Sequence, residues 1–290
     1  RDTNLEIHIS TQLSSTNYQS VNFWKEEGIT RVVLARELSK EELQELRNNT
    51  DADLEVFIHG GMCVSYSGRC TLSNNMTDRD ANRGGCAHSC RWNYDLYDGE
   101  SKLNEEMYFA MSSKDLQTVK HISDLIDIGV DSLKIEGRMK SIHYIATVVS
   151  TYRKLIDNIC DDYDVDLPKY LLEIKKAENR MTSHGFMEGM TTINEQLYNM
   201  RSEQPTQEFI GIVRGYDEET FIAIVEQRNH FVPGDHVEVF SPNFGPMRFV
   251  VEEIKDEDEN ILDAARHPKQ ILKIFIPFKV SEYDMIRKIK

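Results

Sequence analysis

Four of the five cysteines fall in one polar stretch, and they offer the clearest chemistry in the sequence. Residues 55–94 contain the spacing C-x6-C-x15-C-x3-C, formed by Cys63, Cys70, Cys86 and Cys90. The residues between them are mostly Gly, Ser, Asn, Asp and Arg, which cannot fill a hydrophobic core. A loop of this length inside a compact domain is usually functional. We therefore expect the four thiols to bind one metal centre.

The spacing of the cysteines leaves three interpretations open. Thiolates suit both zinc and an iron–sulfur cluster. Zinc ribbons prefer two short cysteine pairs, and the six residues between Cys63 and Cys70 make a wide gap for one. Spacing therefore favours iron–sulfur over zinc, with unligated buried thiols or disulfides as the third interpretation. The fifth cysteine, Cys160, lies on the apolar side of a predicted helix and is expected to be a small buried hydrophobe.

Composition narrows the class of protein. The chain has 290 residues, 40% hydrophobic content and a formal net charge of −15. It has no secretory signal and no apolar run near the ~18 residues of a membrane span, so we expect a cytoplasmic protein without a membrane partner. The negative charge opposes non-specific binding of nucleic acid. Because the sequence starts at Arg1 with a strand pattern close behind, we expect it to begin inside a domain.

The first half of the sequence alternates between strand and helix patterns. Strands are predicted at residues 5–10, 31–35, 54–58, 107–111 and 132–135, and helices at 16–28, 39–48, 115–128 and 141–159. Capping boxes of Thr16 with Gln19 and of Ser39 with Glu42 open the first two helices. This alternation predicts a parallel sheet covered by helices. No glycine fingerprint follows the first strand, so we favour an N-terminally truncated TIM-like (β/α) barrel over a Rossmann sheet.

The pattern changes near residue 161. An acidic connector at 161–166 precedes a predicted helix at 167–180, and residues 181–205 have no clear period. Short β runs then follow at 209–213, 221–225, 236–240, 249–251 and 274–278, which predict a small closed β-barrel. The predicted domains are a partial (β/α) barrel at 1–160 with the cysteine loop at about 60–94, a helical connector at 161–205 and the β-barrel at 206–290.

Polar side chains follow the predicted strands at the end where barrel enzymes place their active sites. Several of them are basic, although the chain as a whole is acidic, and arginine forks bind carboxylates and phosphates in a bidentate manner. The competing interpretation of each is a helix cap, a local ion pair or solvated surface charge. The residues at or near this mouth are His8, Gln12, Arg36, His59, Lys114, Glu136, Arg138 and Lys140, with Arg79 and Arg83 in the cysteine loop.

Several long motifs resemble the U32 family, historically named collagenase-like peptidases. They are EVFIHGGMCVSYSGRCTLSN, NRGGCAHSCRWNY, SSKDL and SLKIEGRMKSIHYIATVVSTYR, with HISTQ and RVVLARELS near the start. GIVRGYDEETFIAIVEQRN and VPGDHVEVFSP resemble the C-terminal β domain of the family. Within the family the sequence is most similar to the bacterial tRNA hydroxylation proteins.

This resemblance implies a 4Fe–4S cluster held by Cys63, Cys70, Cys86 and Cys90. It also implies prephenate-dependent, oxygen-independent hydroxylation of the wobble uridine of certain tRNAs to 5-hydroxyuridine. The partners implied are tRNA, a small anionic co-substrate and a paralogous subunit. Family members carry further residues before Arg1, which would supply the first barrel strands.

On this basis we predict roles for the polar residues of the mouth. His8, His59, Lys114 and Glu136 are candidates for proton transfer. The candidates for substrate binding are Gln12, Arg36, Arg79, Arg83, Arg138 and Lys140. The rival function is a U32-type peptidase, a hydrolase, although the sequence contains no G-x-S-x-G or H-E-x-x-H motif. A third alternative is a non-catalytic module in which zinc staples the cysteine loop.

Overall fold

The computed structural model describes residues 4–103, 109–138, 140–177, 180–197 and 208–289. The chain divides into two compact units. Unit 1 comprises Arg1–Lys140, Thr151–Ile174 and Glu178–Gln204, and unit 2 comprises Ser141–Ser150, Lys175–Ala177 and Pro205–Lys290. Helix α5 (Ile142–Cys160) is continuous and contributes residues to both.

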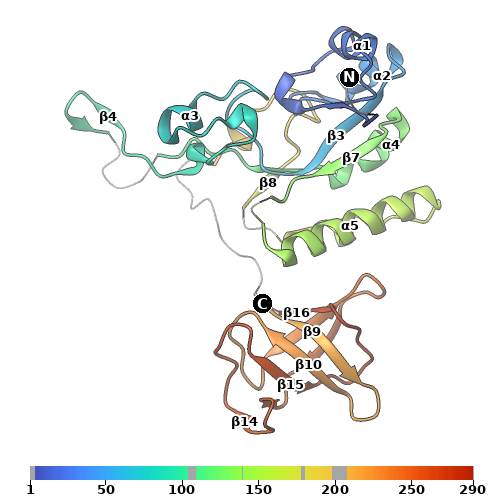
Figure 1. The fold of residues 1–290 in the computed structure, drawn as a ribbon, viewed down its shortest axis with the longest axis vertical. Coiled ribbons are helices and arrows are strands. Elements are labelled where there is room, and N and C mark those ends of the chain that lie inside the picture. The colour runs from blue at the N-terminus through green and yellow to red at the C-terminus, as the bar shows by residue number, and fades with distance from the viewer. Residues whose placement is uncertain (1–3, 104–108, 139, 178–179, 198–207, 290) are drawn as a thin grey trace. The chain divides into compact units, whose positions relative to one another are not determined.

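A six-stranded mixed sheet organises unit 1, with β3 (Asp53–Gly60) at its centre (Figure 1). The strands β1 (His8–Ile9), β2 (Arg31–Val33) and β7 (Ser132–Ile135) run in the same direction as β3. Near His59, β3 also pairs with β6 (Asp115–Gln117), which is antiparallel to it and continues to β8 (Thr182–Ser183). The described strands form this open sheet, and a closed TIM-like barrel stays a prediction.

Three helices of unit 1 pack in a row: α2 (Lys40–Asn48) contacts both α1 (Tyr18–Glu26) and α4 (Ile122–Ile128). The predicted capping box of Ser39 and Glu42 is confirmed at the start of α2, with both hydrogen bonds made. The predicted box of Thr16 and Gln19 is wrong. The side chain of Asn17 caps α1 instead, because its Oδ1 accepts the Ser20 N–H at 2.9 Å.

The largest error of the sequence prediction lies at residues 115–128. A single helix was expected there, but residues Asp115–Gln117 form strand β6, a 3₁₀ turn follows at Val119–His121, and only Ile122–Ile128 is α-helical. Pairing with His59 and Gly60 of β3 holds the first three residues extended, which a local helical pattern cannot reveal.

Other elements agree with the prediction in kind and differ at their ends. β7 and α5 lie where they were expected. α6 (Leu167–Lys175) ends before the predicted residue 180, and residues 178–179 lie outside the described part. The predicted strand at 107–111 falls partly outside it too, and Phe109 forms an isolated antiparallel bridge with Tyr94. Cys160 at the end of α5 is exposed, so the expected buried position is wrong. No helix within the described residues is long and apolar enough to cross a bilayer.

Unit 2 is an antiparallel sheet of eight strands that curls around a single hydrophobic core (Figure 1). The strands are β9 (Phe209–Asp217), β10 (Ile222–Gln227), β11 (His236–Phe240), β12 (Met247–Val250), β13 (Ile254–Lys255), β14 (Ile261–Leu262), β15 (Ile271–Phe275) and β16 (Met285–Lys288). Their order is β12-β11-β16-β9-β10-β15-β13-β14. The sequence predicted five of the eight; β13, β14 and β16 were not predicted.

A buried ion pair fixes the first half of α5 to this sheet within unit 2. The Arg287 side chain on β16 is 0% exposed and that of Glu238 on β11 is 1% exposed, and Arg287 Nε donates to Glu238 Oε1 at 2.8 Å. Lys176 donates to the same carboxylate at 2.7 Å. The Arg287 guanidinium lies over the Phe240 ring, 4.3 Å from its centroid, and reaches Thr147 of α5 at 3.5 Å.

Candidate metal centre and anion-binding site

Strand β3 delivers the cysteine loop at its C-terminal end. Gly60 closes the strand with φ of +124°, and a Cβ there would lie 2.8 Å from Glu136, so the two chains touch where β3 and β7 end. Beyond this point the loop folds into α3 (Leu72–Thr77) and the 3₁₀ turns Ala81–Arg83 and Ser89–Arg91. A hairpin of β4 (Tyr97–Asp98) and β5 (Ser101–Lys102) follows.

Polar side chains hold this loop together in place of a core. Asn82 accepts the Cys70 N–H at 3.2 Å and donates to the Cys70 carbonyl at 2.9 Å. Ser73 donates to the carbonyl of Arg79 and accepts the N–H of Ala87 at 3.0 Å. The main chain around Cys70 is thus positioned by bonds that do not involve its thiol.

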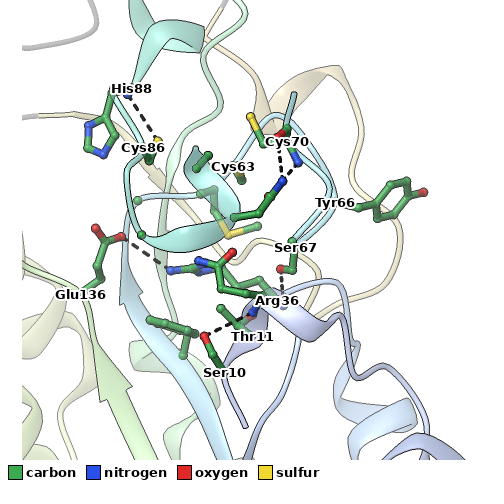
Figure 2. A pocket seen from close by; sticks show the side chains of 18 of the residues that line it. Ser10, Thr11, Arg36, Cys63, Tyr66, Ser67, Cys70, Cys86, His88 and Glu136 are labelled. Carbon is green, nitrogen blue, oxygen red and sulfur yellow. Dashed lines mark hydrogen bonds and ion pairs between the residues drawn. The ribbon is translucent and has the colours of Figure 1, made fainter. Parts of the chain in front are cut away.

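All four clustered cysteines line one cavity of about 300 Å³. Figure 2 shows Cys63, Cys70 and Cys86 grouped on the side of this cavity opposite Ser10 and Thr11. All four are free thiols; Cys63 is exposed and the other three are half-buried. Within the described residues, no three Cys, His, Asp or Glu side chains already stand in the arrangement of a metal site.

The electrostatics of the thiols fit a cationic centre. Although Cys63 is exposed, the surrounding protein partly desolvates its thiol and raises the pKa; a main-chain hydrogen bond from Ser65 offsets this in part, and the neighbouring Cys70 and Cys86 raise the pKa further. Burial likewise raises the pKa of Cys90, although the adjacent Arg91 partly offsets this. Thiolates gathered in one cavity repel one another, and iron ions bound between them would relieve that repulsion. Both the donor set and its position therefore fit an iron–sulfur cluster.

Arg36 and Glu136 form the opposite wall of the same cavity. The Arg36 guanidinium lies 3.7 Å from the centroid of the Phe57 ring and 3.6 Å from Glu136 Oε2 (Figure 2). Burial lowers the pKa of Arg36, while Glu136 raises it in part. Arg138 donates to the carbonyl oxygens of Gly84 and Cys86 and so joins the end of β7 to the cysteine loop.

A buried carboxylate next to the cavity gathers three cations. Asp115, 4% exposed, pairs with Arg91 at 3.1 Å and with Lys140 and Arg180 at 3.4 Å each. Arg91 also donates to the Met62 carbonyl and lines the cavity. A Cβ at Gly61 would come within 2.6 Å of the Arg91 guanidinium, so a larger residue there would displace the end of the Arg91 side chain.

The structure brings together only part of the predicted site. Gln12, Arg36, Glu136 and Arg138 line the cavity with the four cysteines. Lys114 lines a second cavity, and Lys140 is held by Asp115. Arg79, Arg83 and His8 are exposed, and Arg83 pairs with Asp80 at 3.4 Å. None of His8, His59, Arg79, Arg83, Lys114 and Lys140 is among the residues that line the cysteine cavity. Their predicted functional roles stay predictions.

His59 occupies a structural position. It is 1% exposed, and its Nδ1 lies 3.3 Å from the Tyr152 hydroxyl. That hydroxyl donates to the Ile58 carbonyl and accepts the Thr118 N–H, so Nδ1 carries the proton in this contact. Burial lowers the pKa of His59 to about 4, although Asp115 raises it in part. The ring is therefore neutral near pH 7 and bonded into the sheet.

Sequence reasoning missed Arg180, and it placed Asp115, Arg91 and Lys134 at or near the mouth without assigning them individual roles. Asp115 and Arg180 are far apart in the chain and meet because β6 and the start of β8 are neighbours. Lys134 hydrogen-bonds Glu55 at 2.7 Å and lies over the Phe57 ring that Arg36 also contacts. The polar residues at the strand ends pointed to Asp115, but the helix predicted from that residue gave no indication of its three ion-pair partners.

Gly68→Ala is expected to displace the cysteine loop. Gly68 has φ of +72°, and a Cβ there would overlap the carbonyl oxygen of Gln12. The left-handed conformation and the overlap together cost roughly 2–5 kcal/mol. Gly99→Ala is the matched control, because φ is +58° there and nothing lies within 4 Å of the added atom. Iron bound after anaerobic reconstitution should fall in the first variant only; equal iron in both would show that this contact does not position the cysteines.

The family of the chain is defined by two matches to family models. Residues 1–197 match peptidase family U32, and residues 205–287 match the peptidase family U32 C-terminal domain. The chain therefore belongs to peptidase family U32.

Its relatives include proteins with different names. The chain is 50% identical to "tRNA hydroxylation protein P1" of Bacillus subtilis, over 99% of this chain and 70% of that protein. It is 32% identical to "23S rRNA 5-hydroxycytidine C2501 synthase" of Escherichia coli, over 81% of this chain and 34% of that protein. It is 30% identical to "Collagenase" of Porphyromonas gingivalis, over 95% of this chain and 69% of that protein.

Proposed function

We propose that the chain is part of an RNA-hydroxylating enzyme that converts the wobble uridine of tRNA to 5-hydroxyuridine. The observation that carries this proposal is the single cavity in which four cysteines face Arg36, Arg91 and Arg138. The names of its relatives from Bacillus subtilis and Escherichia coli support RNA hydroxylation as the class of reaction. Because tRNA is the substrate, we expect the protein to act in the cytoplasm.

Within this proposal, Cys63, Cys70, Cys86 and Cys90 hold a 4Fe–4S cluster. Such a cluster supplies electron transfer beside the substrate. The arginines Arg36 and Arg138 bind the carboxylates of a small dianion such as prephenate, because a guanidinium fork matches a carboxylate. Glu136 Oε2 is held by Arg36 at 3.6 Å and is placed to accept or return a proton at the cavity wall. We further propose that this hydroxylation does not use molecular oxygen, as the resemblance to the tRNA hydroxylation proteins implies.

The peptidase alternative has less support from the site. A cysteine nucleophile needs a base that removes its proton. Among the described residues, a histidine makes a hydrogen bond to one of these cysteines through its main chain: the His88 N–H donates to Cys86 Sγ at 3.4 Å. A main-chain N–H cannot accept a proton, and although His88 lines the same cavity, no hydrogen bond among the described residues joins its ring to a thiol. A zinc-stapled module would need the arginines around the cavity only for their contacts to Glu136, Asp115 and the loop carbonyls, and not to bind an anion.

Nucleoside mass spectrometry of tRNA from a deletion strain tests the proposed function. Deletion of the gene is expected to remove 5-hydroxyuridine and its derivatives, and the full gene on a plasmid restores them. If a second hydroxylase is present, the strain must lack that gene as well. Unchanged 5-hydroxyuridine in that strain, together with peptide hydrolysis by the purified protein, would favour the peptidase.

A further inference from the structure

A second cavity of about 230 Å³ lies in unit 1 and shares one wall with the cysteine cavity. The segment Met62, Cys63 and Tyr66 lines both cavities. The far wall of the second cavity comes from residues 183–196, which follow β8. Tethers to the segment after Met111 hold this wall: Lys114 N–H donates to the Glu195 carbonyl and Leu197 N–H to the Ser112 carbonyl, both at 2.8 Å.

The two cavities differ in charge. Four cationic side chains and one carboxylate line the cysteine cavity, in addition to its thiols. Lys114, Glu37 and Glu195 are the charged residues of the second cavity. Glu37 accepts hydrogen bonds from Ser67, and Glu195 from Thr192. The second cavity is therefore suited to an uncharged ligand, whereas the first is suited to an anion.

Phe186 gives the second cavity an aromatic wall. Its ring packs against the buried cluster that includes Met62 and Leu116 and also lines the cavity. Gly185 brings the chain close enough for this contact, because a Cβ there would lie 2.8 Å from Leu116 Cδ1. A ring backed by the core on one side presents a fixed face on which a planar ligand can stack.

Gln196 supplies hydrogen-bonding capacity at the same cavity. Its main chain bridges to Ser113, and its side-chain amide makes no hydrogen bond to any other residue that the structure describes. An amide has both a donor and an acceptor, as does the edge of a pyrimidine base. The cavity is smaller than the ~300–1,000 Å³ of sites for drug-sized ligands, so its size fits a single base better than a whole nucleotide.

We propose that this second cavity receives the target pyrimidine base after it leaves its stack, with Phe186 against its face and Gln196 at its edge. Enzymes that modify a base commonly extrude it into such a pocket. The shared segment around Cys63 would then place the base beside the cysteine cavity, while the anionic co-substrate occupies the basic side. This inference rests on the proposed function.

The test measures binding of the full-length, cluster-containing protein to two anticodon stem-loops. One loop carries uridine at the wobble position and the other an abasic site, and fluorescence anisotropy gives both dissociation constants. Wild type is expected to bind the uridine loop roughly 5- to 100-fold more tightly, the range found for stacking of one base on an aromatic ring. Phe186→Ala is expected to remove this difference and leave abasic binding unchanged.

Two further variants keep the result interpretable. Phe23→Ala removes an exposed ring from α1 and should change neither constant. Gln196→Ala leaves Phe186 on the core and should weaken only the uridine loop, by roughly 2- to 10-fold. Equal weakening of both loops by Phe186→Ala would mean that the ring only supports the fold, and the pocket assignment would fall.

The wild-type protein separates failure of the pocket from failure of the proposed function. If it binds both loops equally, the base does not enter a pocket, although tRNA remains the substrate. If it binds neither loop, the proposed function and the pocket both fall. A 4-thiouridine at the wobble position should also crosslink to the peptide that contains Phe186 and Met190, and a crosslink confined to unit 2 would contradict the assignment.

Discussion

Cys70→Ala is expected to lower bound iron to background and to reduce 5-hydroxyuridine in the complemented deletion strain by about 100-fold or more. Even residues that only support metal ligands commonly cost 10–100-fold when changed, and loss of a ligand should reach or exceed that range. Cys70 is a clean position for this test, because its main-chain N–H and carbonyl both bond to Asn82 and hold the loop without the thiol. Iron analysis, visible absorption and nucleoside mass spectrometry give the result.

Cys160→Ala is the matched control for this prediction. Cys160 is an exposed free thiol at the end of α5 and does not line the cysteine cavity. The Cys160→Ala variant should retain bound iron and 5-hydroxyuridine in tRNA at the wild-type level. Full restoration of 5-hydroxyuridine by Cys70→Ala would refute a role for the cluster in the reaction, and stoichiometric zinc after anaerobic purification would identify the thiols as a structural staple.

Glu238→Ala should destabilise unit 2 by about 3–5 kcal/mol, the usual effect of removing one partner from a buried ion pair. The variant leaves Arg287, whose side chain is 0% exposed, in the core without its carboxylate. A loss of this size is a large part of the stability of a domain. This loss is measured by urea titration, with unfolding monitored by hydrogen exchange of the β11 and β16 amides. Tryptophan fluorescence would not report on unit 2, because both tryptophans lie in unit 1.

The same carboxylate gives the prediction a pH dependence. Burial alone would raise the pKa of Glu238, but the hydrogen bond from Lys176 and the charge of Arg287 outweigh it and hold the pKa below its usual value. The stabilising effect of the Glu238 carboxylate is therefore complete above its unfolded pKa of ~4.3 and is lost as the pH falls through its lower pKa in the folded protein. Glu238→Gln should remove this part of the acid sensitivity.

An exposed ion pair of unit 2 provides the contrast. A hydrogen bond from Arg266 lowers the pKa of Asp263 to about 2, yet both side chains are exposed. Solvent screens such a pair, so Asp263→Ala should scarcely change the urea midpoint. A loss of stability in Asp263→Ala equal to that in Glu238→Ala would show that burial does not distinguish the two pairs.

The sequence alone was enough to predict those elements whose signal lies in a few neighbouring residues. The capping box of α2 needs only Ser39 and Glu42, and β7 and α5 follow from their apolar patterns. The four cysteines were singled out by residue type, and the structure places them on one cavity. Their ligation of a cluster was reached by resemblance and stays a proposal.

Contacts between distant segments explain what the sequence could not predict. The apolar residues from Leu116 onward have helical spacing, but β3 holds Leu116 in a strand. The three cations around Asp115 come from segments that meet only in the folded sheet. β16 escaped prediction because Arg287, a charged residue, faces the interior of unit 2, where binary patterning expects an apolar side chain.

The segment shared by the two cavities would make any ligands that bind in them thermodynamically interdependent. Met62, Cys63 and Tyr66 line both cavities, so a ligand that reorders this segment from one cavity alters the free energy of binding in the other. Linkage requires the effect to be reciprocal: whatever factor the first ligand imposes on the affinity of the second, the second imposes on the first. The order in which ligands enter would then be set by the conformation of one short segment of main chain.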